Sequence, residues 1–250
     1  MTGAHKFALV VPTLNEAGSI RTLLERVVAV LSNTTIPWEI LVVDDDSRDG
    51  TADIALGFAQ SDPRVRILVR HGKRGLAGAI TYGWSQTDAD LLGVIDADLQ
   101  HPPEVLSALL GEVRDGADLA IASRYVRPHS MDKWNPLRRA VSRLSILVSK
   151  PVQKPELTIK DPMSGFFVLR RRPISGISFQ QTGFKLLLEI LARGRINSAI
   201  EIPFTFEPRE KGKSKANAMT ALYYFALLYR LCFTRRGNSD AWTKAKSDEA

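Results

Sequence analysis

Short apolar runs alternate with amphipathic helical patterns along the first half of the chain. The runs predict strands over residues 7–12, 39–45, 65–70 and 91–98, and the segments between them predict helices over 19–31, 51–60 and 75–86. This alternation is typical of βαβ units that build a parallel sheet. Because most of the runs are continuously apolar, we expect helices to cover both faces of that sheet.

The same rhythm continues in the second half and weakens after residue 125. It predicts a helix over 103–116, strands over 118–125 and 165–171, a helix over 183–194, and a closing strand with its loop over 196–209. Residues 136–149, between the two predicted strands 118–125 and 165–171, have one apolar helical stripe that consists of Leu137, Val141, Leu144 and Val148. The arginines of this segment lie outside that stripe. That pattern indicates a cationic amphipathic helix.

The end of the chain contains an apolar stretch over 216–233 that is interrupted by Arg230 and falls short of the ~20 residues that cross a bilayer. We expect this stretch to pack on the domain or to lie in a membrane interface, where aromatic residues and terminal arginines are favourable. The polar tail over 234–250 is expected to be disordered. No repeat or low-complexity linker divides the rest, so the main domain is expected over 1–215.

Length and composition fit one large globular domain. The chain has 250 residues, of which 44% are hydrophobic and 24% charged, so the disordered, collagen-like and disulfide-rich classes are excluded. The single cysteine, Cys232, has no partner for an internal disulfide, and the first residues lack the pattern of a signal peptide. These features predict a reducing, cytoplasmic environment.

Charge indicates an anionic partner. The 34 Lys and Arg residues outnumber the 27 Asp and Glu residues, and residues 124–154 alone hold eight basic side chains against one acid, Asp132. A solvated surface would also explain such a run. Beside an apolar helical stripe, however, it favours a membrane surface with anionic headgroups, and we expect the segment 126–154 to face the membrane. No helix-turn-helix, zinc-finger, RRM or KH pattern supports a nucleic-acid partner.

Acidic residues follow the predicted strands. PTLNE comes after the first strand, DDDSRDGT after the second and DADLQ after the fourth, and ligands of parallel sheets bind beyond these carboxyl ends. Asp96 and Asp98 lie one residue apart in a segment expected to be extended, so both carboxylates would point to one side and share a hard cation with the Gln100 amide oxygen. Mg²⁺ or Mn²⁺ bound there would keep positions for phosphate oxygens. The alternative is a solvated loop that caps a helix.

Other reactive patterns are missing. The histidines form neither a Ser/His/Asp triad nor a zinc site; they are His5, His71, His101 and His129. His101 is the one near the predicted site, and we interpret it as a loop residue. The glycines of HGKRGLAGAITYG follow the wrong strand for a dinucleotide fingerprint, and we expect them to permit a tight turn and close packing of helix on sheet.

In this order and spacing, VVPTLNE, VVDDDSRDGT and DADLQ resemble the inverting glycosyltransferases of family 2, which have the GT-A (nucleotide-diphospho-sugar transferase) fold. ASRY, DPMSGFFVLRR, GFKLLLEIL and FEPREKGKSK resemble the polyprenol- or dolichol-phosphate mannose synthase branch, and the resemblance covers about residues 6 to 230. It implies an α/β fold with a mostly parallel central sheet and helices on both faces.

The resemblance also implies roles for individual residues. The nucleoside of the donor would contact Pro12, Leu14, Glu16, Val43 and Asp45. Asp96, Ala97 and Asp98 would lie beneath the ribose and diphosphate, with Asp98 and Gln100 as metal ligands and Asp96 as a further candidate.

Basic residues would hold the phosphates. By the resemblance, Arg124 contacts phosphate, Arg209 and Lys215 belong to a loop that closes over the diphosphate, and Arg138 and Ser142 receive the acceptor phosphate. The chain departs from the family's pattern at Asp46, where Gly or Asn is frequent, and at Leu14, where Tyr is common. Neither change removes a charge that the chemistry needs.

The resemblance predicts an enzyme that transfers a hexose, with mannose from GDP-mannose favoured, to a polyprenyl monophosphate with inversion. A lipid monophosphate has a second pKa of about 6, so its oxygen can attack the anomeric carbon without a general base. UDP-glucose or another nucleotide sugar remains open as the donor, and a non-catalytic basic protein that binds a membrane surface or nucleic acid is the alternative from another class. We expect peripheral docking at the cytoplasmic face of a membrane, unaided or through a separate membrane subunit.

Overall fold

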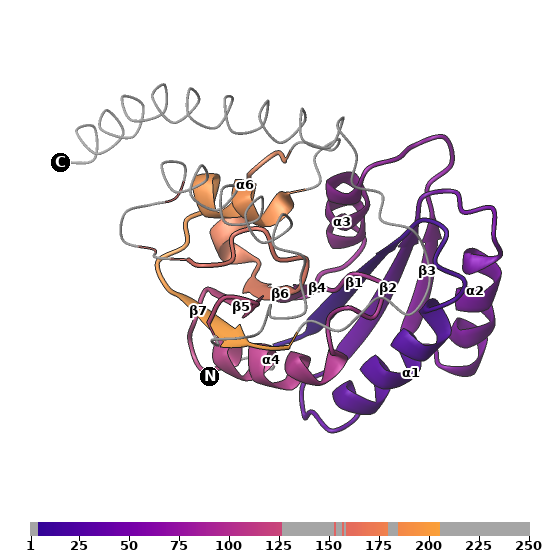
Figure 1. Ribbon diagram of the computed structural model, residues 1–250, viewed down its shortest axis with the longest axis horizontal. Coiled ribbons are helices and arrows are strands. Elements are labelled where there is room, and N and C mark those ends of the chain that lie inside the picture. The colour runs from indigo at the N-terminus through magenta and orange to yellow at the C-terminus, as the bar shows by residue number, and fades with distance from the viewer. Residues whose placement is uncertain (1–4, 127–152, 154–156, 158, 180–184, 206–250) are drawn as a thin grey trace, which may run out of the picture.

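The computed structural model describes residues 5–126, 153, 157, 159–179 and 185–205 (Figure 1). In this part of the chain, one seven-stranded sheet has the order β3-β2-β1-β4-β6-β5-β7. Its strands are β1 (Phe7–Thr13), β2 (Trp38–Asp44), β3 (Val65–Val69), β4 (Leu91–Val94), β5 (Leu119–Ser123), β6 (Phe167–Arg170) and β7 (Ala199–Pro203).

The sheet is mostly parallel, as predicted. β3, β2, β1 and β4 pair in parallel, and so do β5 and β7. β6 lies between β4 and β5 and is antiparallel to both. The other six strands therefore run in one direction, and their carboxyl ends meet at one edge of the sheet.

Helices cover both faces of the sheet, which confirms the prediction from the continuous apolar runs (Figure 1). One layer contains α1 (Ile20–Leu31), α2 (Thr51–Ser61) and α4 (Leu106–Arg114), and the other contains α3 (Leu76–Ser85) and α6 (Leu186–Arg193). Along β1, Phe7, Leu9 and Val11 belong to the core of the first layer, whereas Ala8 and Val10 belong to that of the second. The hydrophobic effect thus stabilises both faces of the same strand.

Several predicted boundaries are too long. The strand predicted over 91–98 ends at Val94, because the chain then turns, with Leu99 at a φ of 59°. The helix predicted over 103–116 consists of a short 3₁₀ turn, η1 (Pro103–Val105), and α4, and it ends before Gly116, whose φ is 127°. A second 3₁₀ turn, η3 (Arg172–Ile174), follows β6. Within the described residues, the other predicted elements correspond to β5, β6, α6 and β7.

Gly83 on α3 explains one glycine of the HGKRGLAGAITYG segment. A Cβ at this position would lie 2.8 Å from Val10 Cγ2 and 3.0 Å from Val43 Cγ2. Gly75, just before α3, has a φ of 142°, which favours glycine. The predicted tight turn and close packing of helix on sheet are therefore confirmed here.

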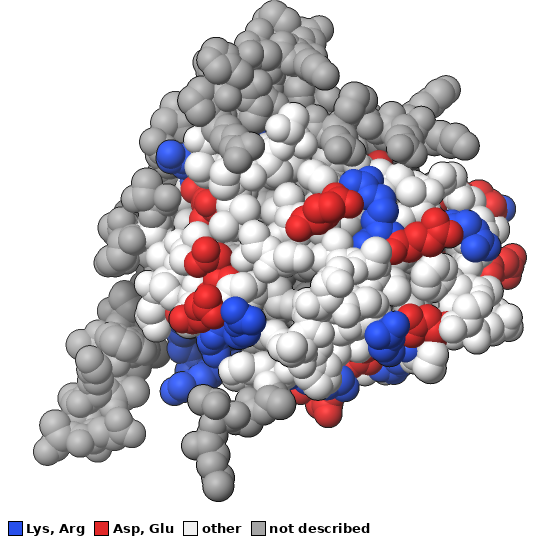
Figure 2. Space-filling view, turned by 90° about the horizontal axis from the view of Figure 1, so that it is seen from below, with Lys and Arg blue, Asp and Glu red and all other residues white. Residues whose placement is uncertain are grey.

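Figure 2 shows acidic and basic side chains lying beside one another on the face seen from below. Among the ion pairs of the described residues, Arg26 Nη2 lies 2.8 Å from Glu104 Oε2. The predictions for 136–149, 216–233 and 234–250, together with Cys232, concern residues outside the described part. Among the described residues, no helix is long and apolar enough to span a membrane.

Candidate active site

The carboxyl ends of β1, β2, β4 and β5 bring most of the predicted site residues to one edge of the sheet. The described residues that end or follow these strands are Pro12, Leu14, Glu16, Val43, Asp45, Asp96, Ala97, Asp98, Gln100 and Arg124. Pro12 and Val43 are direct partners in the β1–β2 register. The predicted residues Arg138, Ser142, Arg209 and Lys215 lie outside the described part.

Asp44 holds the turn that follows β2. Its carboxylate is buried and accepts hydrogen bonds from Thr13 Oγ1 (2.7 Å), Ser47 Oγ (2.6 Å) and the Ser47 backbone N–H (2.7 Å). Asp46, in the same turn, has a φ of 62°. Since Gly and Asn favour this left-handed conformation and Asp tolerates it, the departure noted at this position has a backbone reason.

Asp45 is held by an arginine that the sequence analysis missed. Arg70 Nε donates to Asp45 Oδ1 (2.8 Å) and Arg70 Nη2 to Oδ2 (3.3 Å), and the Gly75 N–H also donates to Oδ2 (2.8 Å). Both side chains of the ion pair are buried. Burial raises the pKa of Asp45, although Gly75 and Arg70 oppose it. Arg70 is the last residue of the predicted strand VRILVR, so it lies at the same carboxyl edge of the sheet as the acids. This position was the signal in the sequence that could have identified it.

The turn after β1 is bonded to the loop after β2. The backbone N–H of Glu16 donates to Thr51 Oγ1 (2.9 Å) and that of Ala17 to Asp49 Oδ2 (3.0 Å). The Asn15 side chain in turn accepts from the Arg48 N–H (3.0 Å). These bonds fix the backbone that carries Glu16 relative to the β2 end.

Asp96 lies against Gly165 and near Lys185 at the start of α6. A Cβ added to Gly165 would lie 2.1 Å from Asp96 Oδ2, so only glycine leaves room for the carboxylate. Burial, and then Asp98, raises the pKa of Asp96 to about 7. Burial, and then Arg124, lowers the pKa of Lys185 to about 8. The two side chains line a cavity of about 170 Å³ together with Ser164 and Gly165.

Asp98 and Gln100 lie in the turn beyond Asp96, and the Gln100 N–H donates to Asp98 Oδ1 (3.1 Å). The described residues contain no group of three or more His, Cys, Asp or Glu side chains that could hold a metal. The donor set nevertheless fits a hard cation, because Asp96 and Asp98 supply carboxylate oxygens and Gln100 supplies an amide oxygen. Gln100 and phosphate oxygens would have to complete such a site.

His101 is a buried residue beneath this turn. Its ring packs against Phe166 (5.9 Å between centroids) and Phe204 (5.2 Å). Burial, and then Arg124, lowers the pKa of His101 to about 4, so the imidazole is neutral near pH 7. The residue lies outside the helices and strands, as interpreted, and its ring packs between two aromatic side chains.

Arg124 is held by Asp161, the second residue that the sequence analysis missed. Arg124 Nε donates to Asp161 Oδ2 (2.8 Å), Nη2 to Oδ1 (2.7 Å) and the backbone N–H to Oδ2 (3.0 Å). Burial disfavours the charge, but the Asp161 carboxylate outweighs it and raises the pKa of Arg124. Asp161 is the first residue of the DPMSGFF motif, which resembles the family's pattern, and this motif was the signal that could have identified it.

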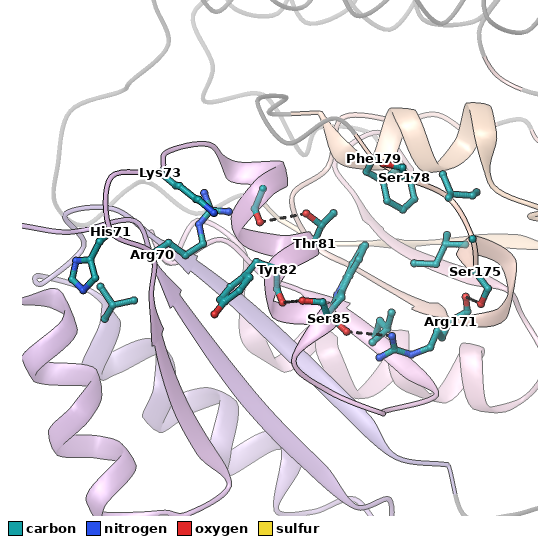
Figure 3. Close-up of a pocket in the computed structure, with 17 residues that line it drawn as sticks. Arg70, His71, Lys73, Thr81, Tyr82, Ser85, Arg171, Ser175, Ser178 and Phe179 are labelled. Carbon is teal, nitrogen blue, oxygen red and sulfur yellow. Dashed lines mark hydrogen bonds between the residues drawn. The ribbon is translucent and has the colours of Figure 1, made fainter.

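A second cavity, of about 740 Å³, lies along α3 and reaches Arg70 (Figure 3). It is lined by Arg70, His71 and Lys73, by Tyr82 and its neighbours on α3, and by the segment from Arg171 to Phe179. None of the predicted site residues lines it. The carboxylates at the sheet edge, with the arginines that contact or neighbour them, therefore favour that edge over the cavity along α3 as the reactive site.

Comparisons with known proteins identify the family of the chain. The family model described as "Glycosyl transferase family 2" matches residues 8–177. The chain is 38% identical to a "Dolichol-phosphate mannosyltransferase" of Pyrococcus furiosus, covering 90% of this chain and 63% of that protein, so it spans less than two thirds of that relative. It is 34% identical to the protein of the same name from Saccharomyces cerevisiae, covering 90% and 86%.

A solved structure of glucosyl-3-phosphoglycerate synthase from Mycobacterium tuberculosis, in complex with Mn²⁺, UDP and glucosyl-3-phosphoglycerate, is similar in fold. Its TM-score is 0.68 at 17% identity, covering 93% of this chain and 80% of that one. This likeness supports the GT-A fold that the sequence motifs predicted.

Proposed function

Because this chain belongs to glycosyl transferase family 2, we propose that it transfers mannose from GDP-mannose to a polyprenyl (dolichyl-type) monophosphate with inversion. One observation carries the proposal: Asp45 held by Arg70, the Asp96–Asp98 pair and Arg124 held by Asp161 meet at one sheet edge. The carboxylates of this edge can accept hydrogen bonds from a nucleoside, and the guanidinium of Arg124 carries a charge opposite to that of a phosphate. The names of the relatives supply the sugar and the lipid.

The donor would lie across the ends of β1, β2 and β4. Its nucleoside would contact Pro12, Leu14, Glu16, Val43 and Asp45, and its ribose and diphosphate would lie over Asp96, Ala97 and Asp98. A carboxylate that is already oriented accepts a hydrogen bond from a base or a ribose hydroxyl without reorganisation, and this preorganisation favours binding. The bonds from Arg70 and Gly75 orient Asp45 in this way.

Asp98 and Gln100, with Asp96 as a further ligand, would hold Mg²⁺ or Mn²⁺. When bound, the ion would neutralise charge that develops on the leaving nucleoside diphosphate. Arg209 and Lys215 are proposed to add positive charge to the same diphosphate, and Arg124 contributes a guanidinium oriented by Asp161.

The acceptor needs no general base, since its phosphate is already ionised near neutral pH. A phosphate oxygen forms the new bond to the anomeric carbon, and the bond from that carbon to the donor diphosphate breaks with its electron pair. Attack opposite the leaving group inverts the anomeric centre and gives a β-linked product from an α-linked donor. Arg124, Arg138 and Ser142 are proposed to receive the acceptor phosphate.

The lipid acceptor implies contact with a membrane. We assign that contact to the basic segment 126–154, which belongs to the domain 1–215 and carries the proposed acceptor residues Arg138 and Ser142, and to the apolar stretch 216–233. Docking at the cytoplasmic face would then be peripheral or assisted by a separate membrane subunit.

The testing experiment incubates the protein and its Asp98→Ala variant with a short polyprenyl phosphate, Mn²⁺ or Mg²⁺, and GDP-mannose or UDP-glucose. The expected result is a metal-dependent mannosyl lipid, detected by mass, with kcat/KM at least about 100-fold lower in the folded variant because charge neutralisation is lost. Asp115→Ala, an exposed acid at the end of α4, serves as the matched control and should match the unaltered protein.

Product from UDP-glucose alone would retain the mechanism and overturn the donor. The absence of any lipid product from folded protein, over a wider panel of nucleotide sugars, would contradict the proposed function. That outcome would return the non-catalytic alternative, a basic protein on a membrane surface.

A further inference from the structure

Glu201 on β7 forms a clamp on a backbone segment beside the site. Its Oε2 accepts the N–H of Lys160 (2.8 Å) and its Oε1 accepts the N–H of Asp161 (2.9 Å). Glu201 pairs with Ile121 in the parallel register of β7 and β5, two residues before β5 ends at Ser123. Each carboxylate oxygen therefore holds one of two consecutive amides, and the peptide that carries Asp161 is anchored to the sheet.

Asp161 is the next link. It belongs to no helix or strand, yet its side chain is fully buried and accepts three hydrogen bonds from Arg124, two from the guanidinium and one from the backbone N–H. A bidentate pair requires the carboxylate to lie in the plane of the guanidinium. The direction of Arg124 therefore depends on where the backbone holds Asp161.

We propose that Glu201 is a positioning residue for Arg124 and acts through Asp161. The carboxylate of Glu201 fixes the 160–161 backbone, Asp161 fixes the guanidinium, and Arg124 is thereby presented to a phosphate group at the sheet edge. The last step rests on the proposed function, in which Arg124 contacts phosphate. Glu201 itself touches neither substrate.

The chain offers a matched control at the other end of the same two strands. Asp118, just before β5, also uses a carboxylate to accept two backbone N–H groups, those of Asn197 (2.8 Å) and Ser198 (3.3 Å) just before β7. No site residue contacts Asp118 among the bonds of the described part. Both N–H groups donate to one oxygen, Oδ2, so Asp118→Asn removes the carboxylate charge from a comparable clamp without reaching Arg124.

The first test is independent of activity. Hydrogen exchange is measured for the backbone amides of Lys160, Asp161 and Arg124 in the full chain, in Glu201→Gln and in Asp118→Asn. Gln has one acceptor oxygen where Glu has two, so exchange at the three amides should be about 10-fold faster in Glu201→Gln and unchanged in Asp118→Asn. Unchanged exchange at Arg124 in Glu201→Gln would overturn the proposal.

The second test is a double-mutant cycle in kcat/KM for mannosyl transfer. Glu201→Gln should lower kcat/KM by about 10-fold, Asp118→Asn should leave it unchanged, and Glu201→Gln combined with Asp161→Asn should be no worse than Asp161→Asn alone. A purely structural role of Glu201 would instead give losses that multiply, and this result would overturn the relay.

If Glu201→Gln does not fold, Glu201→Asp withdraws the charge by one methylene and should show the same changes at smaller size. If no form of the protein transfers a sugar, the proposed function fails. The exchange of the Arg124 amide then still decides whether Glu201 positions it.

Discussion

Asp45 owes its orientation to Arg70, so the first prediction concerns that single side chain. Arg70→Ala removes two hydrogen bonds and leaves a buried carboxylate without its ion-pair partner. We expect the free energy of unfolding to fall by about 3 kcal/mol, since breaking a buried pair leaves an uncompensated charge. The dissociation constant for the nucleoside diphosphate should rise about 10-fold. Urea denaturation and titration calorimetry with GDP measure the two effects.

Arg26→Ala is the control, because Arg26 forms a similar two-bond pair with Glu104 at the exposed surface. Exposed pairs contribute ~0–1 kcal/mol, and GDP binding should not change. Unaltered GDP affinity in folded Arg70→Ala would contradict the role assigned to Asp45.

The free energy of unfolding should depend on pH through Asp96. Burial, and then Asp98, raises its pKa to about 7 from 3.8, so the folded protein holds a proton that the unfolded chain has released. Stability therefore falls as the pH rises through this window. Asp96→Asn, which cannot ionise, should unfold with a free energy about 3 kcal/mol higher than the unaltered protein at pH 7.5 and about equal to it near pH 4, without divalent metal.

The variant should nevertheless have lost activity, because it lacks a carboxylate beneath the donor. Denaturation curves over the pH range, combined with the mass assay, separate the two effects. The measurements stop at pH 7.5 because the pKa of Lys185, lowered by burial to about 8, would add a slope of opposite sign above it. A stability difference that does not vary with pH would refute the raised pKa of Asp96.

At the scale of elements, patterning predicted the parallel strands and both helical layers, because burial on two faces leaves continuous apolar runs in the sequence. It overextended the strand 91–98, since Ile95, Ala97 and Leu99 are buried and apolar although the strand ends at Val94. Apolar character reports burial in a turn as well as in a strand. The antiparallel direction of β6 was likewise not predicted, because an apolar run indicates a strand but not the direction in which that strand pairs with its neighbours.

The α3 helix allows a test of packing against the sheet. Gly83→Ala would place a Cβ 2.8 Å from Val10 Cγ2, so the helix or the strands must shift. We expect a loss of about 2 kcal/mol in the free energy of unfolding, the usual effect of overpacking. Thermal or urea denaturation measures it.

Gly111→Ala on α4 is the matched control, since a Cβ there meets nothing within 4 Å. Alanine in an open helical position should instead stabilise the protein by about 1 kcal/mol. Equal effects of the two substitutions would mean that α3 does not pack closely through Gly83.

At the scale of the whole molecule, the sheet edge could be predicted because its acids follow strands in the sequence. The groups that hold these residues could not. Arg70, Asp161 and Glu201 are bonded to site residues or to the site backbone 25 to 41 positions away, and no local spacing predicts such pairs. Three-dimensional structure was needed to join them. The same holds for Gly165, whose missing Cβ leaves room for Asp96.

We expect the basic segment 126–154 to dock the protein on anionic membranes. Changing Arg138, Arg139 and Arg143 to Gln removes three of the positive charges beside the predicted apolar stripe. Each contributes ~1 kcal/mol near an anionic surface, so binding to vesicles that contain phosphatidylglycerol should weaken about 100-fold in cosedimentation. The control variant changes three other exposed arginines to Gln and lowers the net charge by the same amount; these are Arg21, Arg172 and Arg195. If the control variant binds vesicles as the unaltered protein does, and salt weakens the binding of the unaltered protein, the segment and not the total charge drives docking. Equal losses of vesicle affinity in the two triple variants would contradict this prediction.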